Sequence, residues 1–423
     1  MKNMRIVKCL AALSGLLMVV GCDKPTSSQP SSSSLEQSSS SSEVSSSSSS
    51  SSTFSIPDET NDLLTFTLSE DGTYYIVSKV SAQVTKGVAV IPETYNGKPV
   101  THIAERGFSG CEFLEYIQIP RSITTFGDYA FDECYGLKEV FVPNTVEDLG
   151  YGAFYACYRL EKAVFEEGIK TLGKATFMYT NRLKSFDIPR SVDTLDERVF
   201  NCTHFSTVEI PDNIKKIGFY AFEGCNDLTS VTIPDSVTYI DDGAFENCPV
   251  LTSINIPSGV THFGSCVFAG CRKLPPITIP DNITIIPAYT FHQNYEIKTY
   301  VIPSHISYIG NNAFEECSDM TKITISNGVS IIGKEVFSMC RKLKKVIVPT
   351  SVYEIGKDLF KYLDESGSEP CLYYMGTQEM WEKVNCKTPD LKVYFFSNEY
   401  PEENEENYWR YYNGEPVQWG KWE

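Results

Sequence analysis

The chain is short of positive charge and of long apolar runs. Its 423 residues carry 36 Lys and Arg against 54 Asp and Glu, which gives a formal charge of −18 at pH 7. Such a polyanion repels phosphate backbones, so we exclude a nucleic-acid partner. No apolar run is long enough to span a bilayer as a helix, which excludes a polytopic membrane protein. With 42% hydrophobic residues, the chain can still build a sizeable core.

Motifs that carry chemistry are also missing. The sequence has no Gly-x-Ser-x-Gly elbow, no phosphate loop and no glycine-rich dinucleotide turn. The five histidines are isolated from one another, and none forms the His-x-x-x-His pair that suits a metal. These absences predict a protein that is not an enzyme and has no cofactor, catalytic residue or metal site.

The first residues predict export and a lipid anchor. A basic start precedes an apolar stretch over residues 9–20, and Gly21-Cys22 follow. Residues 1–21 have the pattern of a secretory signal. Their end resembles the lipobox of bacterial lipoproteins, and this resemblance implies that Cys22 is lipidated and anchors the protein to the bacterial membrane. The alternative is an ordinary signal peptide followed by an incidental cysteine.

Residues 22–52 predict a disordered tether. From Ser27 to Ser52 the chain has 19 serines in 26 residues. Such a segment cannot bury apolar surface, and a flexible coil of this length spans roughly 25–30 Å from end to end. We expect it to hold the folded part of the chain away from the membrane.

A period of 23 residues runs through most of the remaining chain. Phenylalanine recurs at positions 108, 131, 154, 177, 200, 222, 245, 268, 291, 314, 337 and 360. Every step is 23 residues except the step of 22 from Phe200 to Phe222. Such self-similarity is typical of a solenoid, because a unit that cannot bury its apolar face alone does so by stacking on its neighbours.

Each unit is expected to hold a short strand, a turn and then a compact helical or 3₁₀ segment. In the copy over residues 228–245, Val231 and Ile233 alternate with Thr232, as in a strand with one buried face. Pro234 ends the strand because it cannot donate a ladder hydrogen bond. Stacked strands then form a parallel sheet with a rise of roughly 4.8 Å per repeat.

This repeated pattern resembles a known family. The run Leu228-Thr229-Ser230-Val231-Thr232-Ile233-Pro234-Asp235-Ser236-Val237, followed by Ile240, Ala244, Phe245 and Cys248, closely resembles the BspA-like, or treponemal-type, leucine-rich repeat. The resemblance covers residues 101–361. It implies an α/β-type solenoid with a parallel β-sheet of about eleven to twelve repeats, bacterial surface localisation and recognition without chemistry.

β-rich caps are expected at both ends of the solenoid. Residues 53–100 resemble the N-terminal cap of the same family, and Asp71-Gly72 between two strand-like runs predicts a hairpin. After Phe360 the period fails, so we interpret residues 362–423 as a C-terminal cap and tail. Asn413-Gly414 between two strand-like runs predicts a second hairpin there.

Nine of the 14 cysteines follow the period. At repeat spacing their thiols form a line, which offers no tetrahedral metal site, and parallel Cβ vectors hold neighbours too far apart for disulfides. We interpret them as a ladder of small buried side chains. Cys371 and Cys386 lie outside the period, and a disulfide between them within the C-terminal cap stays open as an alternative.

The outer face of the sheet is the candidate ligand site. The expected outward positions are Gln118, Phe141, Val164, Asp187, Glu209, Thr232, Asn255, Thr278, Val301, Thr324 and Ile347. A solvated sheet face should be polar, so Phe141 and Val164, followed by Asp187 and Glu209, form an unusual neighbourhood. We expect these four residues in one regular row to contact a ligand. The alternative is an ordinary scatter of β-forming residues.

The sequence therefore predicts a monomeric, exported and lipid-anchored surface protein. Its solenoid is expected to bind a protein or a glycan on a host or a neighbouring cell. Aromatic residues near the C-terminus suit stacking on sugars, although packing within the cap is the simpler interpretation; they are Tyr408, Trp409, Tyr411, Tyr412, Trp419 and Trp422. The alternative function is a structural spacer of the cell envelope without a ligand.

Overall fold

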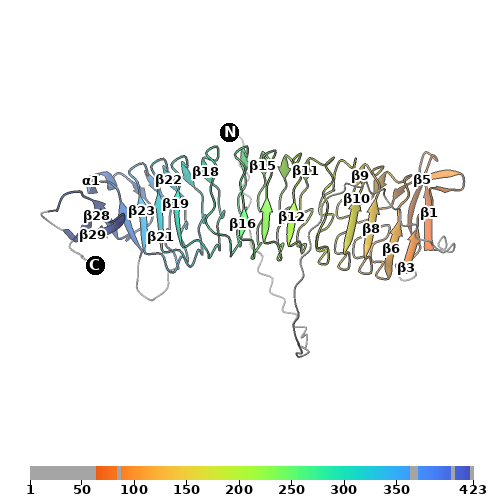
Figure 1. Ribbon diagram of the computed structural model, residues 1–423, viewed down its shortest axis with the longest axis horizontal. Coiled ribbons are helices and arrows are strands. Elements are labelled where there is room, and N and C mark those ends of the chain that lie inside the picture. Colours follow the sequence, from red (N-terminus) through yellow and green to blue (C-terminus); the bar gives the residue numbers. More distant parts are fainter. Residues whose placement is uncertain (1–62, 83–86, 363–369, 402–404, 420–423) are drawn as a thin grey trace, which may run out of the picture. The chain divides into compact units, whose positions relative to one another are not determined.

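The computed structural model of the protein describes residues 63–82, 87–362, 370–401 and 405–419. These residues belong to one compact unit, Pro57–Glu423. They form a solenoid with two sheet sides, to which successive turns of the chain add strands (Figure 1). Strands of successive repeats run parallel within each side. The predicted solenoid is thereby confirmed. The predicted signal peptide, the tether and Cys22 lie outside the described residues.

One side of the solenoid, the first sheet side, carries the predicted strands. Its strands are β3 (Gly87–Val90), β6 (Leu114–Gln118), β8 (Glu139–Val142), β10 (Lys162–Phe165), β12 (Thr207–Glu209), β14 (Ser230–Thr232), β16 (Ser253–Ile254), β19 (Thr299–Ile302), β21 (Lys322–Ile325), β23 (Lys345–Val348), β25 (Cys371–Tyr374), β27 (Val393–Phe396), β28 (Tyr408–Tyr412) and β29 (Glu415–Gln418). Burial alternates along them as predicted: in β8, Val140 and Val142 are buried whereas Phe141 is exposed.

A second sheet side was not anticipated from the sequence. Its strands are β2 (Tyr75–Lys79), β5 (Lys98–Ile103), β7 (Thr125–Phe126), β9 (Asp148–Leu149), β11 (Thr194–Leu195), β13 (Lys216–Ile217), β15 (Tyr239–Ile240), β17 (His262–Phe263), β18 (Ile285–Ile286), β20 (Tyr308–Ile309), β22 (Ile331–Ile332), β24 (Glu354–Ile355) and β26 (Asn385–Cys386). Most of these strands have two residues, of which the second is buried, as Ile240 is in β15. A strand this short has no period-2 pattern to detect.

The turn column is the third side of the solenoid, and its structure differs from the prediction. We define it by residues 243–247, which centre on Phe245, and by the equivalent residues of the other repeats. A compact helical or 3₁₀ segment was predicted, but these residues form turns. The amides of Gly243, Phe245 and Asn247 each donate to a carbonyl of the next repeat, at 2.8, 3.1 and 2.7 Å.

An alternation of backbone conformation explains the turn column. In every repeat the residues two before and two after the phenylalanine have positive φ, for example Gly243 at +62° and Asn247 at +54°. Alternate amides therefore point along the solenoid instead of back along the chain, so a helical hydrogen-bond pattern cannot form. Because the left-handed region is unfavourable for residues with a Cβ, most repeats carry backbone strain there.

The core is continuous along the solenoid. The repeated phenylalanines stack face on face, with ring centroids 5.3 Å apart for Phe222 and Phe245 and 6.2 Å apart for Phe245 and Phe268. One cluster of buried apolar residues runs from Leu64 to Phe395. Offset stacking of aromatic rings adds to the stabilisation that burial provides.

The repeated cysteines form no disulfides, and most of them are buried. Their Sγ atoms donate to the phenylalanine carbonyl of the preceding repeat, as Cys248 does to Phe222 at 3.2 Å. Thr180 replaces a cysteine and donates its hydroxyl to the carbonyl of Phe177 at 2.7 Å. Most of these positions therefore place a small hydrogen-bond donor against a phenylalanine carbonyl, a role that was not predicted from the sequence. Cys371 and Cys386 lie on different sheet sides and form no disulfide.

Both predicted hairpins form. At the N-terminal end, β1 (Leu64–Leu68) pairs antiparallel with β2, and β2 joins the second sheet side through β5. A further two-residue strand, β4 (Thr94–Tyr95), pairs antiparallel with β5. At the other end β25, β27 and β28 continue the first sheet side, and β28 pairs antiparallel with β29 across Asn413-Gly414. Thr377 caps the short helix α1 (Gln378–Trp381), and the 3₁₀ helix η2 spans Glu405–Asn407.

Candidate functional site

The predicted apolar pair lies on the outer face of the first sheet side. Phe141 in β8 pairs in register with Val164 in β10, and the two strands lie side by side in Figure 1. Phe141 is 46% exposed and Val164 is 39% exposed. The structure therefore brings these two side chains together as an exposed apolar patch on an otherwise rigid sheet.

The two predicted acidic residues are exposed, but they do not extend this ladder. Asp187 lies in residues 183–189, which form no strand, and Glu209 is the last residue of β12. β10 pairs with β8, and β12 pairs with β14, but β10 and β12 are not connected by a paired strand. The strand predicted at Asp187 is therefore missing from the ladder, whereas Asp187 and Glu209 keep their predicted exposure.

Bulky side chains accompany this first break. The inward position that holds Val140 in β8 and Val231 in β14 is occupied by Phe186. Its ring lies 5.0 Å from that of Phe177 and 5.5 Å from that of Phe165, centroid to centroid. Three phenylalanine rings therefore fill the core at this level. Beyond the break, Glu209 lines a hollow of about 450 Å³ together with Ser230 and Thr232.

A second break has a clear backbone cause. In most repeats a leucine precedes the strand of the first sheet side, and the backbone amide of the next residue donates to a carbonyl of the preceding repeat. The amide of Thr252, for example, donates to the carbonyl of Thr229 at 2.9 Å. The equivalent residue is Pro275, and Pro276 follows it. Proline has no amide hydrogen, so these residues cannot donate to the ladder. On the next repeat, the hydroxyl of Tyr300 donates to the Ile277 carbonyl at 2.9 Å instead of a strand amide.

The same level is interrupted on the second sheet side. Gly264 donates its amide to Ile240 at 2.9 Å, and Gly310 donates to Ile286 at 2.7 Å. The equivalent residue between them is Pro287, which has no amide hydrogen to donate. Consistent with this, β17 and β18 belong to different sheets. Pro275, Pro276 and Pro287 thus interrupt the backbone hydrogen bonds of both sheet sides between the same two repeats.

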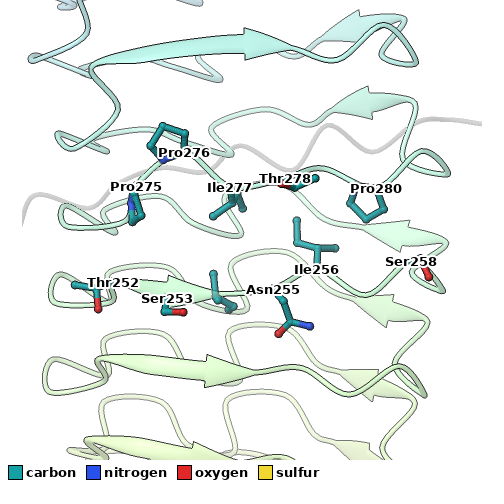
Figure 2. A pocket seen from close by; sticks show the side chains of 11 residues that line it. Thr252, Ser253, Asn255, Ile256, Ser258, Pro275, Pro276, Ile277, Thr278 and Pro280 are labelled. Carbon is teal, nitrogen blue, oxygen red and sulfur yellow. The ribbon is translucent and has the colours of Figure 1, made fainter.

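A groove marks this second break on the outer face (Figure 2). It has a volume of about 380 Å³, and its lining carries no charged side chain. The lining residues are Thr252, Ser253, Ile254, Asn255, Ile256, Ser258, Pro275, Pro276, Ile277, Thr278 and Pro280. Hydroxyl groups and prolyl faces suit a neutral ligand. The groove was not predicted from the sequence, although Pro275-Pro276 at a strand position indicates a break in the sheet.

The C-terminal cap covers the outer face at the end of the solenoid, which corrects another prediction. Ile347 was expected to point outward into solvent, but it is 1% exposed. It packs with Tyr373, Tyr394 and Trp409 in a second apolar cluster. The chain folds back over the sheet here, because apolar side chains on this stretch of the outer face require cover.

Charge pairs hold the cap hairpin on the sheet. Glu415 in β29 lies 2.7 Å from the ammonium group of Lys322 and 3.8 Å from that of Lys345. Lys345 also donates to the carbonyl of Pro416 at 3.2 Å. Trp409 is fully buried and Trp419 is 7% exposed, so the two tryptophans pack within the cap as the simpler interpretation held. Tyr411 and Tyr412 stay exposed.

The described residues contain no group of three or more His, Cys, Asp or Glu arranged to hold a metal ion. The histidines lie against neighbouring side chains: His204 lies 2.9 Å from Asp227, and His102 stacks on Tyr74 with ring centroids 4.4 Å apart. Burial raises the pKa of the Cys317 thiol to about 12, so this cysteine is not a nucleophile near pH 7. No helix in the described ranges has the length and apolar character needed to cross a membrane.

Comparison with known proteins gives a consistent result. A model of the BspA type leucine rich repeat region matches residues 93–203, 195–316 and 240–365, in six copies. Among solved structures, a leucine-rich repeat protein from Bacteroides ovatus is 23% identical with a TM-score of 0.59, over 81% of this chain and 100% of that one. The pneumococcal vaccine antigen PcpA is 17% identical with a TM-score of 0.54, over 79% and 97% of the two chains. A search of curated proteins found no match.

Proposed function

Because the chain belongs to the BspA-type leucine-rich repeat family, we propose that it is a bacterial cell-surface lipoprotein whose solenoid recognises a protein or glycan ligand. It catalyses no reaction and requires no cofactor. The partner sits on a host cell or a neighbouring cell, and the protein acts as a monomer that reaches it from a lipid-anchored tether. The observation that carries this proposal is the outer face of the first sheet side, which stays exposed from Gln118 to Val301 and is covered near Ile347.

The ligand face comprises Phe141, Val164, Asp187 and Glu209. The first two supply apolar contact, and the carboxylates of the other two favour a ligand that carries positive charge. Rigid strands hold Phe141 in place, so no ordering cost arises for it on binding. Because aromatic contacts dominate interface energies, Phe141 is the main anchor, and its truncation costs roughly 1–2 kcal/mol of binding or more.

The test compares three proteins for affinity and melting temperature. These are the parent, Phe141→Ala, and the double variant Asp187→Asn, Glu209→Gln. A ligand is first captured from host or community extract by saturable pull-down and identified. Weaker binding in the variants at unchanged melting temperature supports the face. Unchanged affinity in both variants places the site elsewhere on the solenoid.

The lipid anchor has its own test. In this proposal Cys22 is lipidated after cleavage behind Gly21, and the serine-rich segment spaces the solenoid from the membrane. Cys22→Ala should then move the protein from the membrane fraction to the soluble fraction of cells. Unchanged membrane partitioning would reject the anchor while leaving the recognition proposal untouched.

A second candidate function is a spacer of the cell envelope that has no ligand. The unbroken hydrogen-bond ladder of the turn column favours it, since such a ladder stiffens the solenoid from Arg106 to Lys361. The two functions differ in the pull-down, because a spacer captures no component with saturation. A spacer also tolerates Phe141→Ala without any loss of cell adherence.

A further inference from the structure

Six tyrosines gather on and beside the turn column, away from the proposed ligand face. This tyrosine face consists of Tyr129, Tyr135, Tyr151, Tyr155, Tyr158 and Tyr179. Their rings are half-buried apart from Tyr158, which is 43% exposed. The face spans three successive repeats, and no step of the proposed function uses it.

The rings of the tyrosine face contact one another. Tyr155 is at the centre, with its ring centroid 6.2 Å from that of Tyr129 and 5.6 Å from that of Tyr179, in edge-on geometry. Tyr151 lies 5.4 Å from Tyr129. Tyr135 and Tyr158 stack in parallel at 5.2 Å. Mutual packing limits rotamer freedom, so the face presents a pre-ordered aromatic surface.

The backbone accommodates this surface at a cost. Tyr129 has φ of +57° and Tyr179 has φ of +62°, in a region that bulky residues rarely adopt. Other repeats place glycine at the same two positions, for example Gly152 and Gly224. Gly152 also makes room for the face, since a Cβ there would lie 3.0 Å from the ring of Tyr129.

Carboxylates surround the rings. Asp128 and Tyr151 line a hollow of about 290 Å³ together with Asp148 and Asp196. The one cationic residue that lines this hollow is Lys174, whose ammonium group forms an ion pair with the carboxylate of Glu197 at 3.8 Å. On the far side of the face, burial and then the charge of Glu133 raise the pKa of Tyr135.

The molecule already shows how such rings receive a cation. At the N-terminal edge of the face, the guanidinium of Arg106 lies over the ring of Tyr129 at 4.6 Å. Further along the turn column, Arg198 lies over Tyr220 at 5.0 Å. Aromatic faces beside carboxylates attract guanidinium and ammonium groups more strongly than neutral sugars, because both ring quadrupole and charge favour a cation.

From this geometry we propose that the tyrosine face is a second recognition surface, which binds the arginine and lysine side chains of a basic peptide segment in a partner protein. Tyr155 and its neighbours receive the cationic groups on their exposed ring faces. Asp128, Asp148 and Asp196 neutralise the remaining positive charge. This surface is independent of the proposed ligand face around Phe141.

The test uses the purified full-length protein and a fluorescent decapeptide of alternating arginine and glycine, followed by fluorescence anisotropy. Tyr155→Leu should weaken the affinity roughly five-fold or more, because it removes the central ring and keeps an apolar side chain. The double variant Tyr129→Gly, Tyr179→Gly should do the same while relieving backbone strain. Neither change alters the net charge, so simple attraction to an acidic protein predicts no effect.

Matched controls are available in the same backbone conformation. Tyr289 and Tyr362 have φ of +58° and +56° at the equivalent positions of distant repeats. The double variant Tyr289→Gly, Tyr362→Gly should bind the peptide as the parent does. Circular dichroism checks that all variants fold. Equal affinity of parent and face variants, absence of saturable peptide binding, or tyrosine-dependent binding of a neutral gluco-oligosaccharide in place of the peptide would each overturn the proposal.

Discussion

The turn column and the first sheet side are built by the same repeats but tolerate sequence change differently. The turn column keeps its inter-repeat hydrogen bonds at every step from Arg106 to Met339. The first sheet side is interrupted at residues 183–189 and again at residues 275–279. In the turn column, small and large residues alike occupy the left-handed positions. At the second of these breaks, prolines remove the backbone donors of the strand.

This difference shows what holds a solenoid together. The phenylalanine stack crosses the second break without interruption, with Phe268 and Phe291 at 6.2 Å. The adjacent turn column is also hydrogen-bonded there, since the amide of Phe268 donates to Thr290 at 3.2 Å. The buried phenylalanine stack and the hydrogen-bond ladder of the turn column therefore hold the repeats together at the second break, where both sheet sides are interrupted. The opened side becomes a groove on the surface where ligands are expected.

Truncating the shared core should have the largest effect. Phe245→Ala removes a fully buried ring between Phe222 and Phe268, and we expect it to lower the free energy of unfolding by about 3–5 kcal/mol. The measurement is urea denaturation followed by circular dichroism. Phe141→Ala, on the outer face, is the control and should change stability by less than about 0.5 kcal/mol. Equal losses in the two variants would mean that the stack is not the main support.

A half-buried carboxylate in the turn column should make stability depend on pH. Burial, and then the charge of Glu223, raise the pKa of Glu246 from 4.5 to about 7. The folded state therefore binds the proton more tightly than the unfolded state, so stability falls as the pH rises from about 4.5 to about 7. Glu246→Gln should be more stable than the parent by about 1–2 kcal/mol at pH 8 and should match it near pH 4. The exposed Glu209→Gln is the control; a gain that does not change with pH would refute the assignment.

Relieving strain in the turn column should have a smaller effect. Glu335 has φ of +54°, and Glu335→Gly should raise the free energy of unfolding by about 0.5–1 kcal/mol. The neighbouring Lys334→Gly lies outside the left-handed region and should lower it by a similar amount, since glycine there only adds freedom to the unfolded chain. Thermal unfolding of both variants tests the prediction. Destabilisation by both would show that strain is not relieved at this position.

Restoring ladder donors at the second break should change local protection more than global stability. In Pro275→Thr, Pro276→Ser, the new amides can donate to the preceding repeat, while the unfolded chain gains freedom, so the two effects nearly cancel. Hydrogen exchange should then show slow exchange for residues 275–277 in the variant. In the parent, the amides of Ile277 and Thr278 should exchange faster than that of Phe291. Fast exchange in both proteins would mean that the core, not proline, holds the strands apart.

Several elements could be predicted from the sequence because they depend on local pattern. The 23-residue spacing of Phe108 to Phe360 specifies stacking, and alternation around Val231 specifies a strand with one buried face. Asp71-Gly72 and Asn413-Gly414 predict hairpins, because the conformation of a tight turn depends on its own adjacent residues. The exposure of Phe141 and Val164 followed from the same alternation.

Other features depended on contacts between distant parts of the chain. Ile347 is buried because a hairpin some 65 residues later folds over it, and its own repeat holds no sign of that cover. The tyrosine face exists because stacking brings residues of three repeats within ring contact, although Tyr129, Tyr155 and Tyr179 are far apart in the sequence. The turn column is no helix, since its amides find carbonyls in the next repeat. The sequence period thus determined which repeats stack. The contacts that form only after stacking decided the backbone conformation of the turn column, the burial of Ile347 and the composition of the tyrosine face.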